Sequence, residues 1–438
     1  MGNLIRTLDL RGQSLSAAQI RSLLPRASLD ISQAAEQIRP LLESIESNGV
    51  SAVLEAAQKF DGFNPEPLMV SQAEIDSAVS ALDPELRSAI EESITRVRKV
   101  SEATLPDNVR VELATGAEVT HRWQAIESVG LYVPGGRAVY PSSVVMNVVP
   151  AQVAGVQRLV VATPGQKEFG GRPHPTVLAT AGLLGVTDIL NIGGPSAIAT
   201  FAYGLKEIDF NPVDMVTGPG NIFVAAAKRI LRGEIGIDSE AGTTEILVLA
   251  DNTADARLIA YDLISQAEHD DAAASILVTN SLDLIEAVQI QLQSLVTQTH
   301  HSERVAKALS GQQSALVLVS DVAQSVEIAN AYATEHLEII TADNDAVLKQ
   351  IQHAGAIFLG AYSPVSLGDY MAGSNHVLPT GSTARFNAGL GVHTFLRAQQ
   401  VIDYSRDALA TIADRIDQFA KSEGLPAHGA AVQARFTE

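Results

Sequence analysis

Cysteine is absent from all 438 residues of the chain. Disulfide bonds and thiolate metal sites are therefore excluded, so a bound metal ion would need histidine, carboxylate, amide or water ligands. A cysteine-free chain also fits the reducing environment of the cytoplasm, which is where we expect the protein.

Basic residues are scarce as well: 30 lysines and arginines stand against 50 aspartates and glutamates, which gives a formal net charge of −20. Such a chain repels phosphate, so we expect neither nucleic acid nor an anionic membrane surface as a partner. No apolar run approaches the roughly 20 residues that span a bilayer, and the N-terminal stretch lacks the apolar centre of a signal peptide. We therefore expect a soluble, cytoplasmic protein.

Two common nucleotide-binding motifs, G-x-G-x-x-G and the P-loop lysine motif, do not occur. A weaker signal is TGPGN at residues 217–221, where Gly218 and Gly220 precede a helical pattern whose free N–H groups could face a phosphate. A tight turn between a strand and a helix explains the same residues. The motif alone does not decide between the two interpretations.

Helical patterns fill residues 30–105. Ser71 and Glu74 form a capping-box pattern, and Asp83-Pro84 is typical of a helix start. Pro40 is expected to kink or break the first long helix.

From about residue 128 onward, short apolar strands alternate with helical stretches, and several strands end in glycine or proline, as in VGLYVPGG and DMVTGPG. This alternation is typical of parallel sheets, whose ligands bind beyond the carboxyl ends of the strands. We predict an α/β fold with two Rossmann-like parallel-sheet domains, an N-terminal helical domain and a helical C-terminal tail. The predicted boundaries are 30–105 for the helical domain, 131–241 for the first Rossmann-like domain, 1–29 with 106–130 and 242–390 for the second, and 391–438 for the tail.

The stretch SQAEHD places Gln266 and His269 three residues apart, on one face of a predicted helix. That spacing suits half of a metal site whose other ligands lie elsewhere in the chain. It also suits an ordinary helix end, where a histidine serves as a cap or an ion-pair partner.

Two further stretches could carry chemistry. The long loop 363–386 holds Asp369 and His376, and long ordered loops on a rigid scaffold are often functional. Adjacent Glu335 and His336 open a predicted strand, where they could act as a base and its orienting group. Adjacent titratable residues also occur by chance, so the pair alone does not establish a function.

Several distinctive motifs occur together and in order: VGLYVPGG, YPSSVVMNVVPAQVAG, TGPGNIFVAAAKR, IDSEAGTTEILVLAD, DLISQAEHD, EHLEI, SPVSLGDYMAGSNHVLPTGSTARF and EGLPAHG. On these motifs the chain resembles the histidinol dehydrogenase family, and the resemblance extends over nearly its whole length.

The resemblance implies one Zn²⁺ per site, held by Gln266, His269, Asp369 and His428. The last of these would come from the partner subunit, which implies a homodimer with a swapped C-terminal tail. A set of nitrogen and oxygen ligands also suits a chain without cysteine.

The implied reaction oxidises L-histidinol to L-histidine through histidinal, with two NAD⁺ and two hydride transfers. His336 would take the alcohol proton, and Glu335 would activate a water that adds to the aldehyde. The missing cysteine supports this role for Glu335, because the aldehyde cannot pass through a thiohemiacetal. The zinc ion would orient the substrate. The implied substrate contacts are Thr244, Gln266, His269, His336, Asp369, His376, Glu423 and His428.

For NAD, the resemblance implies contacts from Tyr132, Ser196 and Asn221. Many members of the family have a glutamine where Ser196 stands; serine is shorter, so this direct contact would be lost or bridged by water.

Three competing readings stay open on the sequence. The first is a paralogous zinc and NAD dehydrogenase for another small amino- or hydroxy-alcohol; the presence of Glu423 and His428 argues against it. The second is a zinc hydrolase in which Glu335 activates water. The third is a metal-binding protein without catalysis, which the pair Glu335 and His336 argues against.

Overall fold

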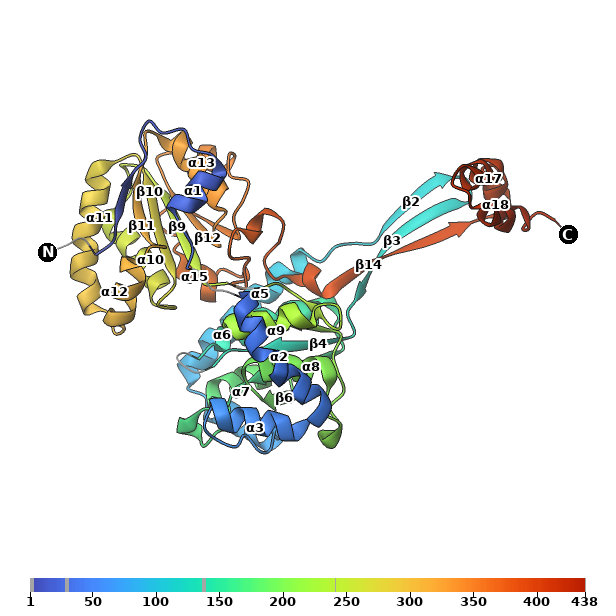
Figure 1. The fold of residues 1–438 in the computed structure, drawn as a ribbon, viewed down its shortest axis with the longest axis horizontal. Coiled ribbons are helices and arrows are strands. Elements are labelled where there is room, and N and C mark those ends of the chain that lie inside the picture. Colours follow the sequence, from blue (N-terminus) through green and yellow to red (C-terminus); the bar gives the residue numbers. More distant parts are fainter. Residues whose placement is uncertain (1–3, 28–30, 136–138, 241, 438) are drawn as a thin grey trace.

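The structure, a computed structural model, describes residues 4–27, 31–135, 139–240 and 242–437. Two parallel sheets are each covered by helices, and a thin antiparallel arm carries the C-terminal helices away from both (Figure 1). The predicted α/β fold with two Rossmann-like sheets is confirmed. Within the described part, no helix is long and apolar enough to cross a membrane.

The first sheet has five parallel strands in the order β6-β5-β4-β7-β8. The chain moves outward from β4 to β6 and then returns to the other side of β4 with β7. The switch point at which such sheets bind ligands therefore lies between β4 and β7. The elements are β4 Ser128–Tyr132, α6 Pro141–Ala154, β5 Arg158–Thr163, α7 Pro175–Leu183, β6 Asp188–Asn191, α8 Gly194–Tyr203, β7 Met215–Thr217, α9 Ile222–Leu231 and β8 Gly236–Ile237.

Four helices of the region 31–103 lie beside this sheet: α2 packs against α8 and α9, α4 against α7, α5 against α6, and α3 against α2. The region predicted as a helical domain, 30–105, thus shares its apolar cores with the first sheet; Leu42, for example, belongs to the same buried cluster as Ile198. The helices are α2 Ile31–Asn48, α3 Val50–Phe60, α4 Gln72–Ala81 and α5 Pro84–Ala103.

Local signals at these helices are mostly confirmed. Ser71 and Glu74 form the predicted capping box, and the Asp83 side chain caps α5 ahead of Pro84. The helix does not break at Pro40, because α2 runs from Ile31 to Asn48 with Pro40 inside it. Pro40 lies on the exposed face of α2, where water can satisfy the carbonyl that loses its partner.

The second sheet has six parallel strands in the order β1-β11-β10-β9-β12-β13, with its switch point between β9 and β12. The N-terminal strand β1 pairs with β11 and forms one edge of the sheet, and β13 forms the other edge. The elements are β1 Thr7–Asp9, α1 Ala17–Leu23, β9 Glu245–Ala250, α10 Ala256–Ala267, β10 Ala274–Thr279, α11 Leu282–Leu295, α12 Ser302–Ser310, β11 Ala315–Leu318, α13 Val322–Tyr332, β12 His336–Ile340, α14 Asn344–Leu348, β13 Ala356–Leu359 and α15 Val365–Tyr370.

The arm is a three-stranded antiparallel sheet in the order β14-β3-β2. Segment 106–130, assigned from sequence to the second Rossmann-like domain, instead supplies β2 (Val109–Ala114) and β3 (Ala117–Ala125) of this arm. The predicted tail 391–438 is helical from residue 406 onward, and β14 (Leu396–Tyr404), for which no strand was predicted, precedes its helices. Those helices are α16 Arg406–Ala410, α17 Ala413–Ser422 and α18 Pro426–Gln433.

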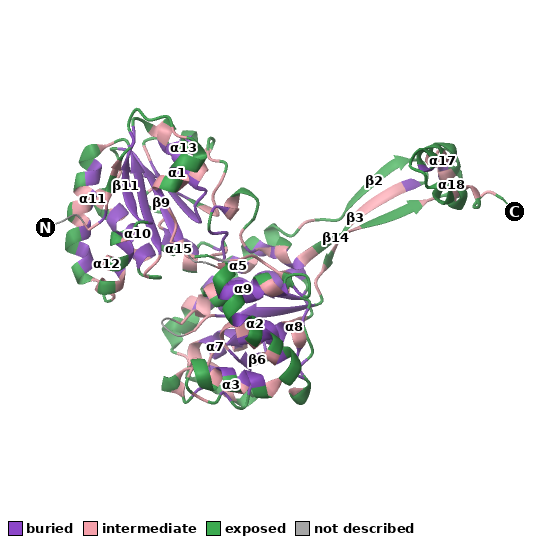
Figure 2. Ribbon diagram, in the orientation of Figure 1, coloured by how far each residue is buried: buried purple, intermediate pink, exposed green. Residues whose placement is uncertain are grey.

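Buried residues concentrate in the strands of the two parallel sheets, whereas the arm is mostly exposed or half-buried (Figure 2). β2 is exposed at all of its positions. The arm therefore has almost no core of its own within one chain.

Candidate active site

Glu335 and His336 lie at the amino end of β12, which the chain reaches through a turn after α13. Ala333 ends that helix with a φ of 51°, in the left-handed region that non-glycine residues rarely adopt. The pair is buried beside the start of β9. This is the amino end of the sheet, opposite to the edge at which we expected ligands from the sequence.

The Glu335 carboxylate is held by two donors at its Oε2 atom. The hydroxyl of Thr244 donates to it over 2.6 Å, and the backbone N–H of Glu245 donates over 3.0 Å. Burial dominates these bonds and raises the pKa of Glu335 to about 8. A carboxyl group with that pKa can exchange a proton near neutral pH, as a general base must.

The His336 ring is fixed by the main chain. Its Nδ1 atom lies 3.2 Å from the carbonyl oxygen of Glu245, a position that suits an N–H donating to that oxygen. Burial lowers the pKa of His336, which favours the neutral ring. A neutral imidazole with its proton on Nδ1 has a free lone pair on Nε2, so His336 can accept a proton there.

Gln266 lies in the last turn of α10 and is linked to Glu335 through Thr244. Its amide Nε2 donates to the Thr244 hydroxyl over 2.6 Å, and that hydroxyl donates to Glu335. The amide oxygen of Gln266 is buried, and among the described residues no hydrogen-bond partner faces it. An orphaned amide oxygen is a suitable ligand for a cation.

His269 and Asp369 face each other beside this amide. His269 lies two residues beyond the end of α10, so it shares the helix end with Gln266 rather than a helical face. Its Nε2 atom is 4.0 Å from Oδ2 of Asp369. Two ligands of a tetrahedral zinc ion lie about 3.4 Å apart, so a small rotation of either side chain would suit both to one ion.

His376 joins the same cluster from the loop after α15. Its Nδ1 atom lies 3.0 Å from the carbonyl oxygen of Asp369, and its Nε2 atom lies 3.1 Å from the hydroxyl of Ser143. Burial lowers the pKa of His376, and the nearby charge of Asp369 opposes this. Seven of the predicted site residues thus meet at one place: Thr244, Gln266, His269, Glu335, His336, Asp369 and His376.

Glu423 and His428 do not join this cluster within one chain. Glu423 follows α17 and His428 lies in α18, both exposed at the far end of the arm (Figure 1). Accordingly, among the described residues no group of three or more histidine, aspartate or glutamate side chains could hold a metal ion. One chain supplies an amide oxygen and one histidine–aspartate pair.

A pocket of about 380 Å³ lies at the switch point of the first sheet, and Tyr132, Ser196 and Asn221 all line it. The Tyr132 hydroxyl accepts from the backbone N–H of Gly194 over 3.0 Å, which fixes the ring. The Asn221 side chain caps α9, so the N-terminus of that helix opens toward the pocket. The pocket is therefore suited to a nucleotide.

Nearly half of the pocket wall comes from α2, α3 and the following loop, a region in which no cofactor contact was predicted from the sequence. It includes Phe60, Asp61 and Phe63. No local motif marks these residues, because they acquire their role only when the helices pack on the first sheet.

The glycine of TGPGN that the turn requires is Gly218. Its φ is 111°, and a Cβ atom there would lie 2.1 Å from the carbonyl oxygen of Tyr132. The buried Lys228 ammonium donates to the carbonyl oxygen of Gly218 over 2.5 Å and to Asp238 over 2.6 Å, while the N–H of Gly218 donates to Asp238. The loop is thus fixed against the pocket by a buried ion pair.

A nucleotide-sized pocket on one parallel sheet and a buried carboxyl–imidazole pair on the other fit an oxidoreductase that uses a nucleotide cofactor. The family model "Histidinol dehydrogenase" matches residues 24–436. The chain belongs to the histidinol dehydrogenase family and is an NAD-dependent oxidoreductase.

Individual relatives agree with this. The chain is 53% identical over 434 residues to the histidinol dehydrogenase of Leifsonia xyli, with 99% of this chain and 100% of the relative covered. It is 53% identical over 432 residues to that of Mycolicibacterium smegmatis, with 98% and 97% covered. The crystal structure of histidinol dehydrogenase from Elizabethkingia anophelis matches with a TM-score of 0.92 at 29% identity, covering 100% of this chain and 99% of the other.

Proposed function

We propose that the protein oxidises L-histidinol to L-histidine through histidinal, with two NAD⁺ and one zinc ion per site, as the last steps of histidine biosynthesis in the cytoplasm. The observation that supports this best is the buried pair Glu335 and His336, which lies beside an orphaned amide oxygen and a facing histidine–aspartate pair. Membership of the histidinol dehydrogenase family is the basis for proposing L-histidinol as the substrate.

His336 is the base for the alcohol. Its Nδ1 side is occupied by the Glu245 carbonyl oxygen, so Nε2 accepts the hydroxyl proton as hydride leaves the carbon. The lowered pKa keeps the ring neutral, and therefore able to accept a proton, at the start of each cycle.

Glu335 acts in the second oxidation. Because the chain has no cysteine, the aldehyde has to be hydrated before hydride can leave again. Glu335 takes a proton from the attacking water, and its two donors at Oε2 leave Oε1 for this task. The same proton then passes to solvent when the acid is released.

The zinc ligands we propose are Gln266, His269 and Asp369 of one chain and the partner subunit's His428. The amide oxygen, imidazole nitrogen and carboxylate oxygen fit the preferences of zinc, and the 4.0 Å between His269 and Asp369 leaves room for an ion. When bound, the ion orients the substrate's amine and imidazole, which is templating rather than activation of the reacting hydroxyl.

A homodimer supplies the fourth ligand. The arm exposes apolar side chains along its strands and tip, and apolar surface of this kind is usually covered by a partner. Examples are Leu113, exposed by 61%, Ile402 by 69% and Phe419 by 73%. Swapping the arm would bury them and bring Glu423 and His428 to the partner's substrate, together with Thr244, Gln266, His269, His336, Asp369 and His376 of that subunit.

NAD would bind in the pocket of the first sheet, held by Tyr132 and Asn221, with the shorter Ser196 losing its direct contact or making it through water. The free N–H groups at the N-terminus of α9 would suit its phosphates.

The decisive experiment mixes zinc-loaded protein with L-histidinol and NAD⁺ and measures NADH and histidine together. We expect about two NADH per histidine, one for each hydride transfer. A yield of one NADH with free aldehyde would overturn the role of Glu335. His336→Ala should lower turnover by roughly two to four orders of magnitude, and an unchanged rate would remove His336 as the base.

The competing functions are separated in the same assay. A paralogous enzyme would turn over another amino- or hydroxy-alcohol faster than L-histidinol. A zinc hydrolase would release product from esters or amides without forming NADH.

A further inference from the structure

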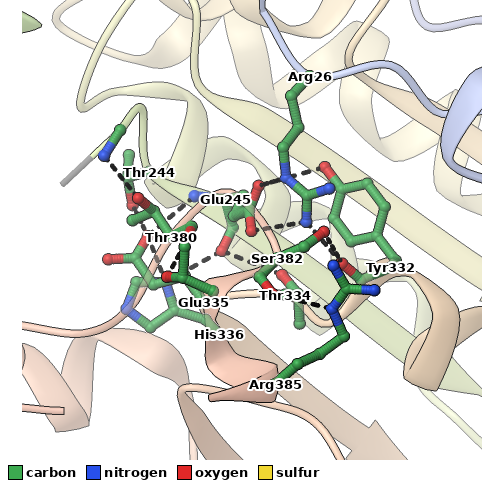
Figure 3. Close-up of polar contacts among 12 residues, drawn as sticks. Arg26, Thr244, Glu245, Tyr332, Thr334, Glu335, His336, Thr380, Ser382 and Arg385 are labelled. Atoms are coloured by element: carbon green, nitrogen blue, oxygen red, sulfur yellow. Dashed lines mark hydrogen bonds and ion pairs between the residues drawn. The ribbon is translucent and has the colours of Figure 1, made fainter. Parts of the chain in front are cut away.

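Glu245 opens β9 with its carboxylate buried and paired to an arginine from the N-terminal segment. Arg26 Nε lies 2.5 Å from Oε2 of Glu245, and Nη2 lies 2.9 Å from Oε1 (Figure 3). The guanidinium also stacks over the ring of Tyr332, 3.8 Å from its centroid. This two-point geometry fixes both the distance and the angle of the pair, which lysine could not do.

The main chain of Glu245 contacts both members of the catalytic pair. Its N–H donates to Glu335 Oε2 over 3.0 Å, and its carbonyl oxygen lies 3.2 Å from His336 Nδ1. The backbone position of this one residue therefore sets where the carboxylate lies and which nitrogen of His336 carries the proton.

Arg26 also holds the chain segment that leads to the pair. Its Nη2 donates to the carbonyl oxygen of Tyr332 over 2.7 Å, and the hydroxyl of Ser382 donates to the same oxygen over 2.9 Å. Tyr332 is followed by Ala333 in its left-handed conformation and, two residues later, by Glu335. One guanidinium thus connects the start of β9 with the turn that enters β12.

We propose that Arg26 and the carboxylate of Glu245 are positioning residues for Glu335 and His336, an assignment that rests on the catalytic roles proposed above. Arg26 acts through Glu245 and Tyr332 and has no part in binding substrate. Its charge also balances that of Glu245, which would otherwise stand unpaired in the protein interior beside Glu335.

Three variants separate positioning from general stability. Arg26→Gln removes the charge and one arm of the fork, and leaves Glu245 unpaired. Arg26→Gln with Glu245→Gln removes both charges and leaves two amides that can hydrogen-bond. The matched control is Arg21→Gln, because Arg21 donates to the carbonyl oxygen of Ala331 in the same region but does not contact Glu245.

We expect Arg26→Gln to lower kcat by about 10- to 100-fold with KM for NAD⁺ changed less than about threefold, because the pocket of the first sheet is untouched. The double variant should regain at least a third of the lost factor on a logarithmic scale, and Arg21→Gln should keep at least half of wild-type kcat. Should Arg26→Gln fail to fold, the double variant and Arg26→Lys give the same comparison, with kcat lower in Arg26→Lys than in the wild type.

A second readout needs no substrate and stays valid if the proposed reaction is wrong. In ¹⁵N-histidine-labelled protein, the ring signals of His336 are assigned by their loss in His336→Gln. We expect wild type to hold the proton on Nδ1, and Arg26→Gln to show a mixture of the two tautomers or a mobile ring.

Three results would overturn the positioning role: wild-type kcat in Arg26→Gln, an equal loss of kcat in Arg21→Gln, or an unchanged His336 tautomer in Arg26→Gln. Absence of any L-histidinol oxidation by the wild-type protein would instead overturn the proposed function, and the tautomer measurement would still decide the positioning.

Discussion

The position of the arm predicts which of the two chains of a dimer completes each active site. Glu335 and His336 lie on the second sheet, whereas Glu423 and His428 lie at the exposed end of the arm, away from both sheets (Figure 1). A swapped dimer therefore builds each site from the body of one subunit and the tail of the other. Two inactive variants that damage different parts should then restore each other.

The pair of variants is His428→Ala, damaged in the tail, and Glu335→Gln, damaged in the body. A random mixture contains about half mixed dimers. In each mixed dimer, the intact body of the first variant receives the intact tail of the second, so one of its two sites is complete. The mixture should regain about a quarter of wild-type activity per dimer, and purified mixed dimers about half.

The assay co-expresses the two variants with different affinity tags, purifies the doubly tagged dimer and follows NADH formation with L-histidinol. The matched control pairs Glu335→Gln with His336→Ala, since both damage the body and no site in that mixed dimer is complete. If the tail served its own chain, the first mixed dimer would also contain no complete site. Activity no higher than in the control pair would therefore refute the swapped arrangement.

Three further predictions concern single residues. In metal-free protein, burial raises the pKa of Glu335 from 4.5 to about 8, so the folded state holds its proton more tightly and loses stability as pH rises from about 5 to 8. Glu335→Gln should escape this loss: in denaturant unfolding, its stability relative to wild type should be greater at pH 8 than at pH 5 by a few kcal/mol. Parallel pH curves of the two proteins would contradict the raised pKa. Gly218→Ala should cost about 2–4 kcal/mol of unfolding free energy, because it combines a φ of 111° with a clash on Tyr132. The control Gly233→Ala has a similar φ of 112° but open space around the added Cβ atom, so it should cost about 1 kcal/mol. Equal costs of the two variants in thermal melting would show that the clash at Gly218 is relieved. Asp61→Asn should raise the ratio of kcat/KM for NADP⁺ to kcat/KM for NAD⁺ by about tenfold, because it removes a negative charge from the pocket that would receive the additional phosphate of NADP⁺. An unchanged ratio would mean that this phosphate binds beyond the reach of the Asp61 charge.

Local patterns predicted what depends on local physics. The strands of both sheets are continuous apolar runs because helices cover both faces, and such runs stand out in the sequence. The box of Ser71 and Glu74 closes within one helical turn, so its two partners can be recognised from their spacing.

The arm was not predicted, although part of it carries a local strand pattern. The β2 sequence VRVELA alternates apolar and polar residues, yet all of its positions are exposed, so its apolar side chains pack on no core within the chain. Its neighbour β3 pairs with β14, which lies near the other end of the chain. A three-stranded sheet that joins β2 and β3 to so distant a strand cannot be recognised from any one local pattern.

Pairs of residues that are far apart in the chain but in contact at the site also could not be predicted from the sequence. The ion pair of Arg26 and Glu245 joins residues 219 positions apart, and although Glu245 lies in the motif IDSEAGTTEILVLAD, nothing in that motif indicates Arg26 as its partner. The resemblance identified Glu335, His336 and the residues around them, but the partner that holds Glu245 became visible only in three dimensions.

The pairing of β3 with β14 also has a consequence for synthesis of the chain. About 270 residues separate the end of β3 from the start of β14. A ribosome that adds about 5–20 residues per second needs on the order of tens of seconds to make them. During that time the β2–β3 hairpin has an unpaired edge, where nascent chains are prone to stick to one another. Slow translation or high expression would therefore be most harmful at this hairpin.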